Sequence, residues 1–244
     1  MKYFFTILFL LFASPVFATV TTVYPDPSVE STSVDGFSQS NLGAGSTWAA
    51  NHDAASGTGT DDSGTAMEIE SMEQAGESAR FEIERAFFLF DTSAITDTDV
   101  VSSATLSLAT LLIINTDDDG LDYVNIYTTT PAANTAIANA DYDQIGTTAQ
   151  ATAIDFGSLA AAGNYTDFTL NATGISSITL TGITKFGGRE GHDVENTSIT
   201  TDTRNLWQVS SADTALTTLD PKLVITHGAA ASPTASPIDA LLWD

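Results

Sequence analysis

The sequence predicts an all-β protein, an antiparallel, jelly-roll-like β-sandwich of about ten strands with one or two short helices. Runs of four to ten residues alternate apolar and polar side chains, which is the period of a half-buried strand. Gly, Asn, Asp or Pro separates these runs, as in sandwiches built from short strands. Hydrophobic residues make up 43% of the 244 residues and charged residues only 16%, a balance typical of a globular chain.

The predicted strands follow one another along the chain with little helical pattern between them. Their ranges are 19–24, 67–70, 81–90, 105–114, 124–127, 153–156, 165–170, 183–186, 206–209 and 223–226. The segment 81–90 alternates apolar and acidic residues at first and becomes wholly apolar at 86–90. Two or three helical turns are expected within 134–144, and one turn is expected at 173–177.

Residues 1–18 have the pattern of a secretory signal peptide. Lys2 supplies a positive charge, residues 4–13 are almost wholly apolar, and 16–18 place small or branched residues before a cleavage point. We expect cleavage after Ala18, a secreted or extracellular surface location, and no membrane span afterwards, because the run is too short to cross a bilayer. The alternative is a buried N-terminal strand or helix.

The remaining chain is predicted to hold one β-sandwich domain, 19–228. Residues 50–64 are small, polar and Gly-rich, which indicates an exposed loop. Residues 229–244 are expected to form an Ala/Ser/Pro linker and a short apolar tip, Ile238 to Asp244, that docks on other surface proteins.

The charge excludes several classes of protein. The chain has 31 acids, 7 bases and a net charge of −24, so it lacks the cationic surface that nucleic acids and anionic membranes require. Without cysteine it has no disulfide, thiolate metal site or thiol nucleophile. Glu68, Glu70, Glu82 and Glu84 alternate along strands, where we expect them to keep sheet faces soluble.

Three segments resemble a known family of secreted modules. Residues 85–108 read Arg, apolar residues, Phe-Asp, Ser, Ile and then Val-x-Ser-Ala-x-Leu-x-Leu; 182–196 and 220–227 match later segments. They are similar to the disaggregatase-related, DNRLRE-type β-sandwich modules. That resemblance implies a β-sandwich attached to extracellular enzymes or surfaces, with acidic or neutral polysaccharide as the ligand.

The clearest local motif is Asn115 to Asp122, NTDDDGLD. Asn115, Asp117 and Asp119 alternate before Gly120, as in the first half of a calcium loop, and Asp122 adds a further oxygen. A structural Ca²⁺ is one interpretation, with no organic cofactor. The other is a hairpin in which Asp and Gly simply form the turn.

Residues 189–196 bring base, acid, imidazole and amide together. One interpretation is a ligand-binding loop formed by Arg189, His192, Asp193 and Asn196, with Trp48 stacking on a sugar ring from beside the Gly-rich segment. In the other, Arg189 pairs with a neighbouring acid and Asp193 and Asn196 cap the turn.

Catalytic motifs are scarce. The chain has three histidines and neither a G-x-S-x-G nor an H-E-x-x-H motif, so we expect no enzyme. The sequence therefore predicts a secreted, non-catalytic binding module for polysaccharide or another cell-surface ligand. The alternative is a structural or adhesive surface subunit that contacts other proteins.

Overall fold

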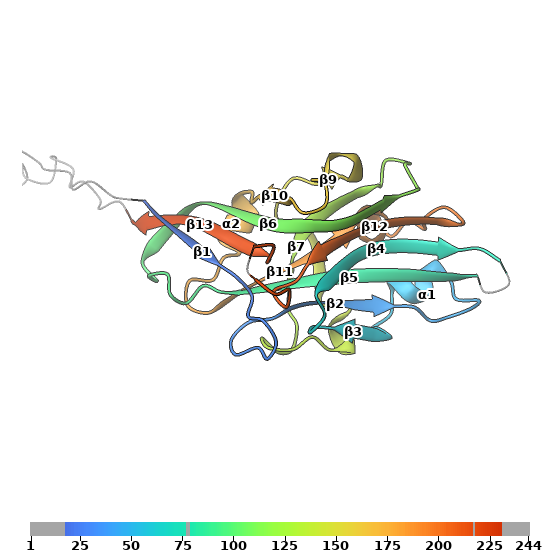
Figure 1. Cartoon of the computed structure of the whole chain (residues 1–244), viewed down its shortest axis with the longest axis horizontal. Helices are drawn as coiled ribbons and strands as arrows, with labels where there is room; N and C mark the ends of the chain where they lie inside the picture. The colour runs from blue at the N-terminus through green and yellow to red at the C-terminus, as the bar shows by residue number, and fades with distance from the viewer. Residues whose placement is uncertain (1–17, 77–78, 217, 231–244) are drawn as a thin grey trace, which may run out of the picture.

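The computed structural model describes residues 18–76, 79–216 and 218–230, and within them it confirms the predicted all-β class (Figure 1). Thirteen strands are joined by three one-turn α-helices and two 3-10 turns. The strands are β1 (Thr19–Val23), β2 (Asp35–Ser40), β3 (Gly59–Asp61), β4 (Ala66–Gln74), β5 (Arg80–Asp91), β6 (Asp99–Asn115), β7 (Tyr123–Thr129), β8 (Ile145–Ala149), β9 (Ile154–Asp155), β10 (Tyr165–Thr169), β11 (Ile183–Glu190), β12 (Thr203–Ser210) and β13 (Lys222–Ala229). The helices are α1 (Trp48–His52), α2 (Ala172–Ser176) and α3 (Gly191–Glu195), and the 3-10 turns are η1 (Asn139–Asp141) and η2 (Phe156–Ser158).

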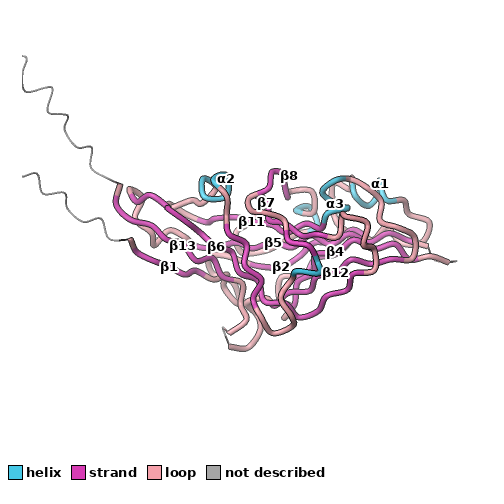
Figure 2. The backbone as a smooth tube through the Cα atoms, turned by 90° about the horizontal axis from the view of Figure 1, so that it is seen from above, coloured by secondary structure: helices cyan, strands magenta, loops and turns pink. Residues whose placement is uncertain are grey.

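The sandwich is built around its two longest strands, β5 and β6. Each pairs with different strands along its length. β5 pairs β4 through residues 80–84, β2 through 83–88 and β11 through 86–91. β6 pairs β13 through residues 99–107 and β12 through 110–115. Every pairing between the named strands is antiparallel, and the path runs β1-β13-β6-β12-β4-β5-β11-β7-β8. The result is a twisted sandwich-like body (Figure 2).

The main core lies between these layers. It is built on inward-facing residues of most strands, among them Ile69, Phe88, Leu106, Phe186 and Trp207. The Trp207 indole N–H is satisfied by Thr110 Oγ1 at 3.0 Å. Burial on both faces explains why 86–90 is wholly apolar.

The second face of β5 forms a smaller core. Phe87 and Leu89 pack there with Tyr127 and Ile145, away from the main core.

Several sequence predictions require correction or confirmation. The ten predicted strands correspond to observed strands, but β2, β3 and β8 were not predicted. The segment 50–64 is not simply an exposed loop, because it contains the end of α1 and the whole of β3. The predicted turn at 173–177 corresponds to α2, whereas 134–144 contributes only η1.

The terminal predictions fall mostly on residues without a description. Residues 1–17 of the predicted signal peptide lie outside the described residues. So do most of the predicted linker and the whole apolar tip. Strand β13 runs to Ala229. Thr19 pairs with His227, so both described ends leave the same end of the molecule, opposite α1 (Figure 1). Over the described residues, none of the helices is long and apolar enough to cross a membrane.

Candidate functional site

The segments predicted to carry the ligand site meet at one end of the molecule. Helices α1 and α3 lie at the end opposite the described termini (Figure 2). Residues 116–122, between β6 and β7, lie against the start of α3, because a Cβ on Gly191 would be 2.1 Å from the Leu121 carbonyl oxygen. Only glycine fits at this first position of α3.

The single turn of α3 is formed by caps at both ends. The Glu190 carboxylate accepts the backbone N–H groups of His192 and Asp193 at 2.8 and 3.4 Å, as an N-cap does. Asn196 ends the helix in the left-handed conformation with φ 48°, which Asn tolerates better than most residues. The turn brings Asp193 back over Arg189, four residues earlier.

Asp193 is the centre of a buried ion network. Arg85 donates to its carboxylate at 2.6 and 2.9 Å, and Arg189 donates at 2.6 and 2.9 Å. Burial opposes ionisation, but the two guanidinium groups outweigh it and hold the pKa of Asp193 well below its usual range. The Arg85 guanidinium also lies 4.1 Å from the centre of the Tyr142 ring. This network therefore joins β5, β11 and α3.

Four of the five predicted ligand-binding residues are buried in this region. Arg189 is 4% exposed, and His192 and Asp193 are fully buried. Asn196 alone is exposed. The geometry matches the second interpretation, in which Arg189 pairs with a neighbouring acid and the other residues fix the turn.

Trp48 does not present the exposed ring that stacking on a sugar requires. Its side chain is 7% exposed and packs edge-on against Phe81 at 6.0 Å between ring centres. Its indole N–H donates to Asn196 Oδ1 at 3.1 Å. Its cluster includes Ile83 on β5, Tyr142 and Ile199, which lie far from Trp48 in sequence, so the small residues that follow Trp48 do not decide its exposure.

The four predicted calcium ligands separate into two pairs. Asn115 Nδ2 donates to Asp122 Oδ2 at 2.9 Å. Asp117 and Asp119 instead face His192, whose Nε2 lies 3.5 and 3.4 Å from one oxygen of each. The structure thus adds a histidine to two of the predicted ligands.

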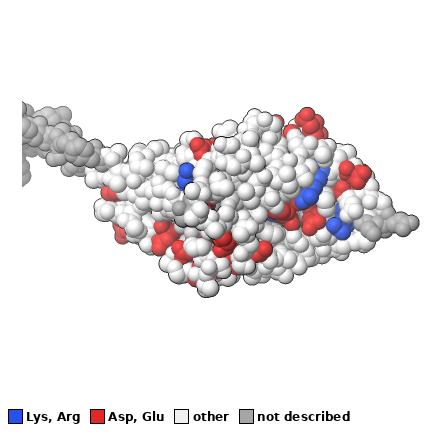
Figure 3. Space-filling view, viewed as in Figure 1, with Lys and Arg blue, Asp and Glu red and all other residues white. Residues whose placement is uncertain are grey.

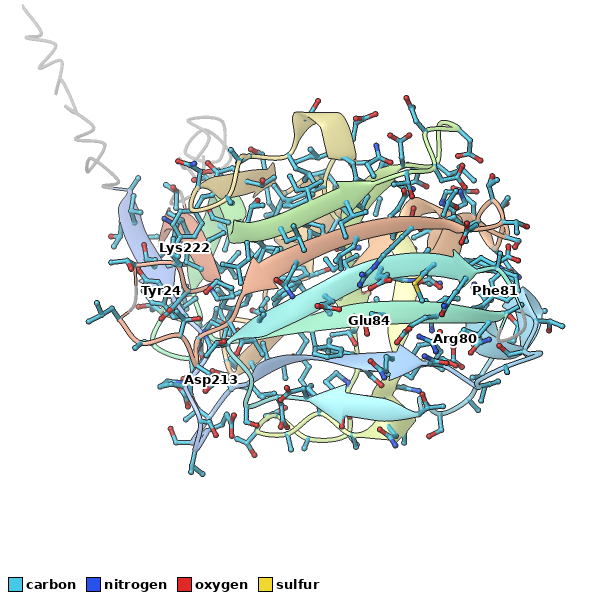
Figure 4. The ribbon with its side chains drawn as sticks, turned by 45° about the vertical axis from the view of Figure 1, so that its right-hand side comes forward. Tyr24, Arg80, Phe81, Glu84, Asp213 and Lys222 are labelled. Carbon is cyan, nitrogen blue, oxygen red and sulfur yellow. The ribbon has the colours of Figure 1, made fainter. Side chains whose placement is uncertain are left out.

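A second cluster, which the sequence did not predict as a site, lies across β12, β4 and β5. Glu68, Glu70 and Glu84 place carboxylate oxygens within 4.8 Å of one another. Arg204 donates to both Glu70 oxygens at 2.6 and 2.7 Å, and Gln208 donates to Glu68 at 2.6 Å. We call this surface the glutamate face; it consists of Glu68, Glu70, Glu82, Glu84, Arg204 and Gln208. Figure 4 labels Glu84. Figure 3 shows acidic and basic atoms together over these strands.

Burial changes the proton affinity of the glutamate face. Burial and the neighbouring carboxylate of Glu68 raise the pKa of Glu84 to about 11. Burial also raises the pKa of Glu70 to about 7, against the opposing effect of Arg204. Glu84 therefore carries a proton at neutral pH.

The alternation of these glutamates was visible in the sequence, but their burial was not. We expected all four to face solvent, and this is wrong for Glu70 and Glu84, which are 1% and 4% exposed. Glu68 and Glu82 keep part of their surface in solvent. The antiparallel register, with Glu70 directly opposite Glu84, gathers these acids on one side of the sheet.

Comparison with known proteins adds no assignment. No protein-family model matches the chain, and no curated protein gives a significant match.

Proposed function

We propose that the chain is an extracellular, non-catalytic binding module and that the glutamate face is its ligand-binding surface. The observation that carries the proposal is a set of hydrogen-bonding side chains on three adjacent strands, partly open to solvent and fixed by mutual contacts. The side chain of Arg204 is 37% exposed and that of Glu68 is 22% exposed, while Glu70 beneath them is buried.

The chemistry of this surface suits a polysaccharide. Carboxylate oxygens accept hydrogen bonds from sugar hydroxyls, and the Arg204 guanidinium donates to sugar oxygens. Leu112 on β6 is 44% exposed and lies opposite Gln208 on β12, so it offers an apolar contact for a sugar ring beside the polar groups. Strands also hold such groups more rigidly than loops do.

The charge of the protein narrows the choice of polysaccharide. With a net charge of −24 and an acid-rich surface, the protein repels polyanions at a distance. Neutral or amine-bearing glycans are therefore the ligands this surface favours. The range of ligands is therefore narrower than the one implied by the family resemblance, which included acidic polysaccharides.

The experiment is a panel of immobilised neutral, amine-bearing and uronate glycans, tested with the wild type, Glu68→Gln and Glu73→Gln. Glu73 lies on the same strand with its side chain on the opposite face, so it matches the charge change without touching the surface. We expect retention on neutral or cationic glycans, weakened ~10-fold by Glu68→Gln and unchanged by Glu73→Gln.

Three results would overturn the proposal. They are no retention on any glycan, equal effects of the two variants, and release of new reducing ends from a glycan, which would instead indicate an enzyme.

A contact surface for other proteins is the second candidate, favoured by β1. Its only strand partner among the described residues is β13, and Val20 on it is 63% exposed. An open strand edge of this kind accepts another strand. Deletion of Ile238 to Asp244, which lie outside the described residues, should abolish self-association or surface attachment and leave glycan retention intact if this candidate is right.

A further inference from the structure

The buried imidazole of His192 has one nitrogen without a hydrogen bond. Nδ1 lies 2.8 Å from Glu190 Oε1, and with Glu190 ionised this nitrogen donates to the carboxylate. Within the described part of the chain, Nε2 has no hydrogen-bond partner, although the side chain is fully buried. A buried polar atom left unpaired is costly, so its surroundings require an explanation.

Two carboxylates lie in front of this nitrogen. Nε2 is 3.5 Å from Asp117 Oδ2 and 3.4 Å from Asp119 Oδ1, and the three groups place ligand atoms within 4.8 Å of one another. These separations exceed those of a charge-assisted N–H···O bond, which are ~2.7–2.9 Å. They match two donor atoms that share one metal ion, since ligands about 2.0–2.1 Å from a tetrahedral metal lie about 3.3–3.4 Å apart.

Hydrogen bonds from neighbouring residues fix each of the three groups. Asn205 accepts the Asp117 backbone N–H at 3.1 Å and donates to its carbonyl at 3.0 Å. The Thr200 N–H donates to Asp117 Oδ2 at 2.6 Å, and the Leu121 N–H donates to Asp119 Oδ1 at 2.9 Å. Together with the Glu190–His192 contact, this is the carboxylate–histidine arrangement that orients metal-binding imidazoles.

We propose that His192 Nε2, Asp117 and Asp119 bind a divalent transition metal of the zinc type. The imidazole decides the class of metal, because Ca²⁺ and Mg²⁺ prefer oxygen ligands whereas imidazole suits zinc, copper, nickel and iron. The side chain of Asp119 is 42% exposed, so the site opens to solvent and water completes the coordination. Asn115 and Asp122, the other two residues predicted for calcium, bind each other and are not in this set.

The test begins with chelator-treated, dialysed protein. Zn²⁺ is titrated by calorimetry into the wild type, Asp119→Asn and Asp118→Asn, and the imidazole nitrogens are followed by NMR. Asp118 is exposed in the same β6–β7 loop and lies outside the cluster, so it matches the charge change. We expect one Zn²⁺ per chain, a shift confined to the His192 Nε2 signal, a loss of affinity above ~10-fold in Asp119→Asn, and little change in Asp118→Asn.

Each remaining outcome overturns the proposal. Absence of Zn²⁺ binding, shifts at His52 or His227 instead of His192, or equal affinities of the two variants would each do so. Ca²⁺ is the comparison ion: tighter binding of Ca²⁺ than of Zn²⁺, lost in Asp122→Asn, would establish the oxygen-only calcium loop instead. His192→Gln should abolish Zn²⁺ binding, and Asp119→Asn keeps the test decisive if burial of the replaced side chain prevents folding.

Discussion

Glu84 and Arg85 are neighbours on β5, yet their side chains enter opposite electrostatic environments. On the Arg85 side, two guanidinium groups surround the single carboxylate of Asp193, and its pKa falls. On the Glu84 side, the carboxyl of Glu84 lies among Glu68, Glu70 and Glu82, with Arg204 bound to Glu70, and the pKa of Glu84 rises. Burial is similar on both sides, so the local ratio of bases to acids decides whether a buried carboxyl ionises.

This difference has a consequence for function. The Asp193 network is closed and satisfied, which suits a structural role. The glutamate face has more acceptors than donors and part of its surface is in solvent, which suits hydrogen bonding to a ligand. The chain has only 7 bases. The positions of Arg85, Arg189 and Arg204 therefore determine which of these buried carboxyls have a cationic partner.

The largest effect on stability should come from disrupting the Asp193 network. Asp193→Asn leaves Arg85 and Arg189 buried without a counter-charge, so we expect a loss of about 3–5 kcal/mol in the free energy of unfolding, measured with denaturant. Asp53→Asn is the control, because Asp53 is exposed and contacts His52 at the edge of the network. A loss below ~1 kcal/mol in Asp193→Asn would contradict the structural role of the network.

The next effect should come from the glutamate face, where replacing a buried carboxyl should raise the stability instead of lowering it. The pKa of Glu84 in the folded chain, about 11, lies above its ordinary 4.5, so the unfolded chain releases this proton first as pH rises. The wild type therefore loses stability above pH 4.5, by up to ~1.4 kcal/mol per pH unit. Glu84→Gln cannot ionise, so we expect it to equal the wild type near pH 4 and to be more stable at pH 8, by an amount that this slope limits to ~5 kcal/mol.

The control for that comparison is Glu73→Gln, on the neighbouring strand β4 with its side chain on the opposite face of the sheet. Chemical denaturation at both pH values checks the difference. A Glu84→Gln protein with the wild-type pH dependence would show that Glu84 ionises normally.

A smaller effect on stability should follow removal of Arg204 from the glutamate face. Arg204→Met leaves Glu70 buried without its partner, and we expect a loss of ~1–2 kcal/mol at pH 8. The loss should shrink at pH 4, because the folded-state pKa of Glu70 is about 7 and the carboxyl is then protonated. Arg80→Met removes a more distant contact, 4.0 Å from Glu82, and should change stability by less than ~0.5 kcal/mol. Equal losses in the two variants would refute a special role for Arg204.

The fold could be predicted from the sequence where local pattern and burial coincide. Segment 81–90 changes from alternating to wholly apolar, and the structure places its second half between two cores. By contrast, β2 (Asp35–Ser40, DGFSQS) has no apolar alternation and becomes a strand because β5 pairs with it. Strands of that kind follow from tertiary contacts, which single-sequence patterns do not contain.

The candidate sites were harder to predict for the same reason. Arg85 and Asp193 are 108 residues apart, and no local spacing relates them. The sequence did predict that Asp117 and Asp119 act together, since they are two residues apart in one short loop. It could not add His192, which reaches them only because α3 folds against the β6–β7 loop.

The central claim is that one chain holds buried carboxyls in two opposite ionisation states. Carbon-detected NMR titration of the side-chain carboxyls tests it directly, with resonances assigned by Asp193→Asn and Glu84→Gln. We predict that Asp193 stays ionised to well below the usual pKa of an aspartate, while Glu84 keeps its proton through neutral pH and titrates near pH 11. Two carboxyls that titrate together near pH 4 would contradict the account.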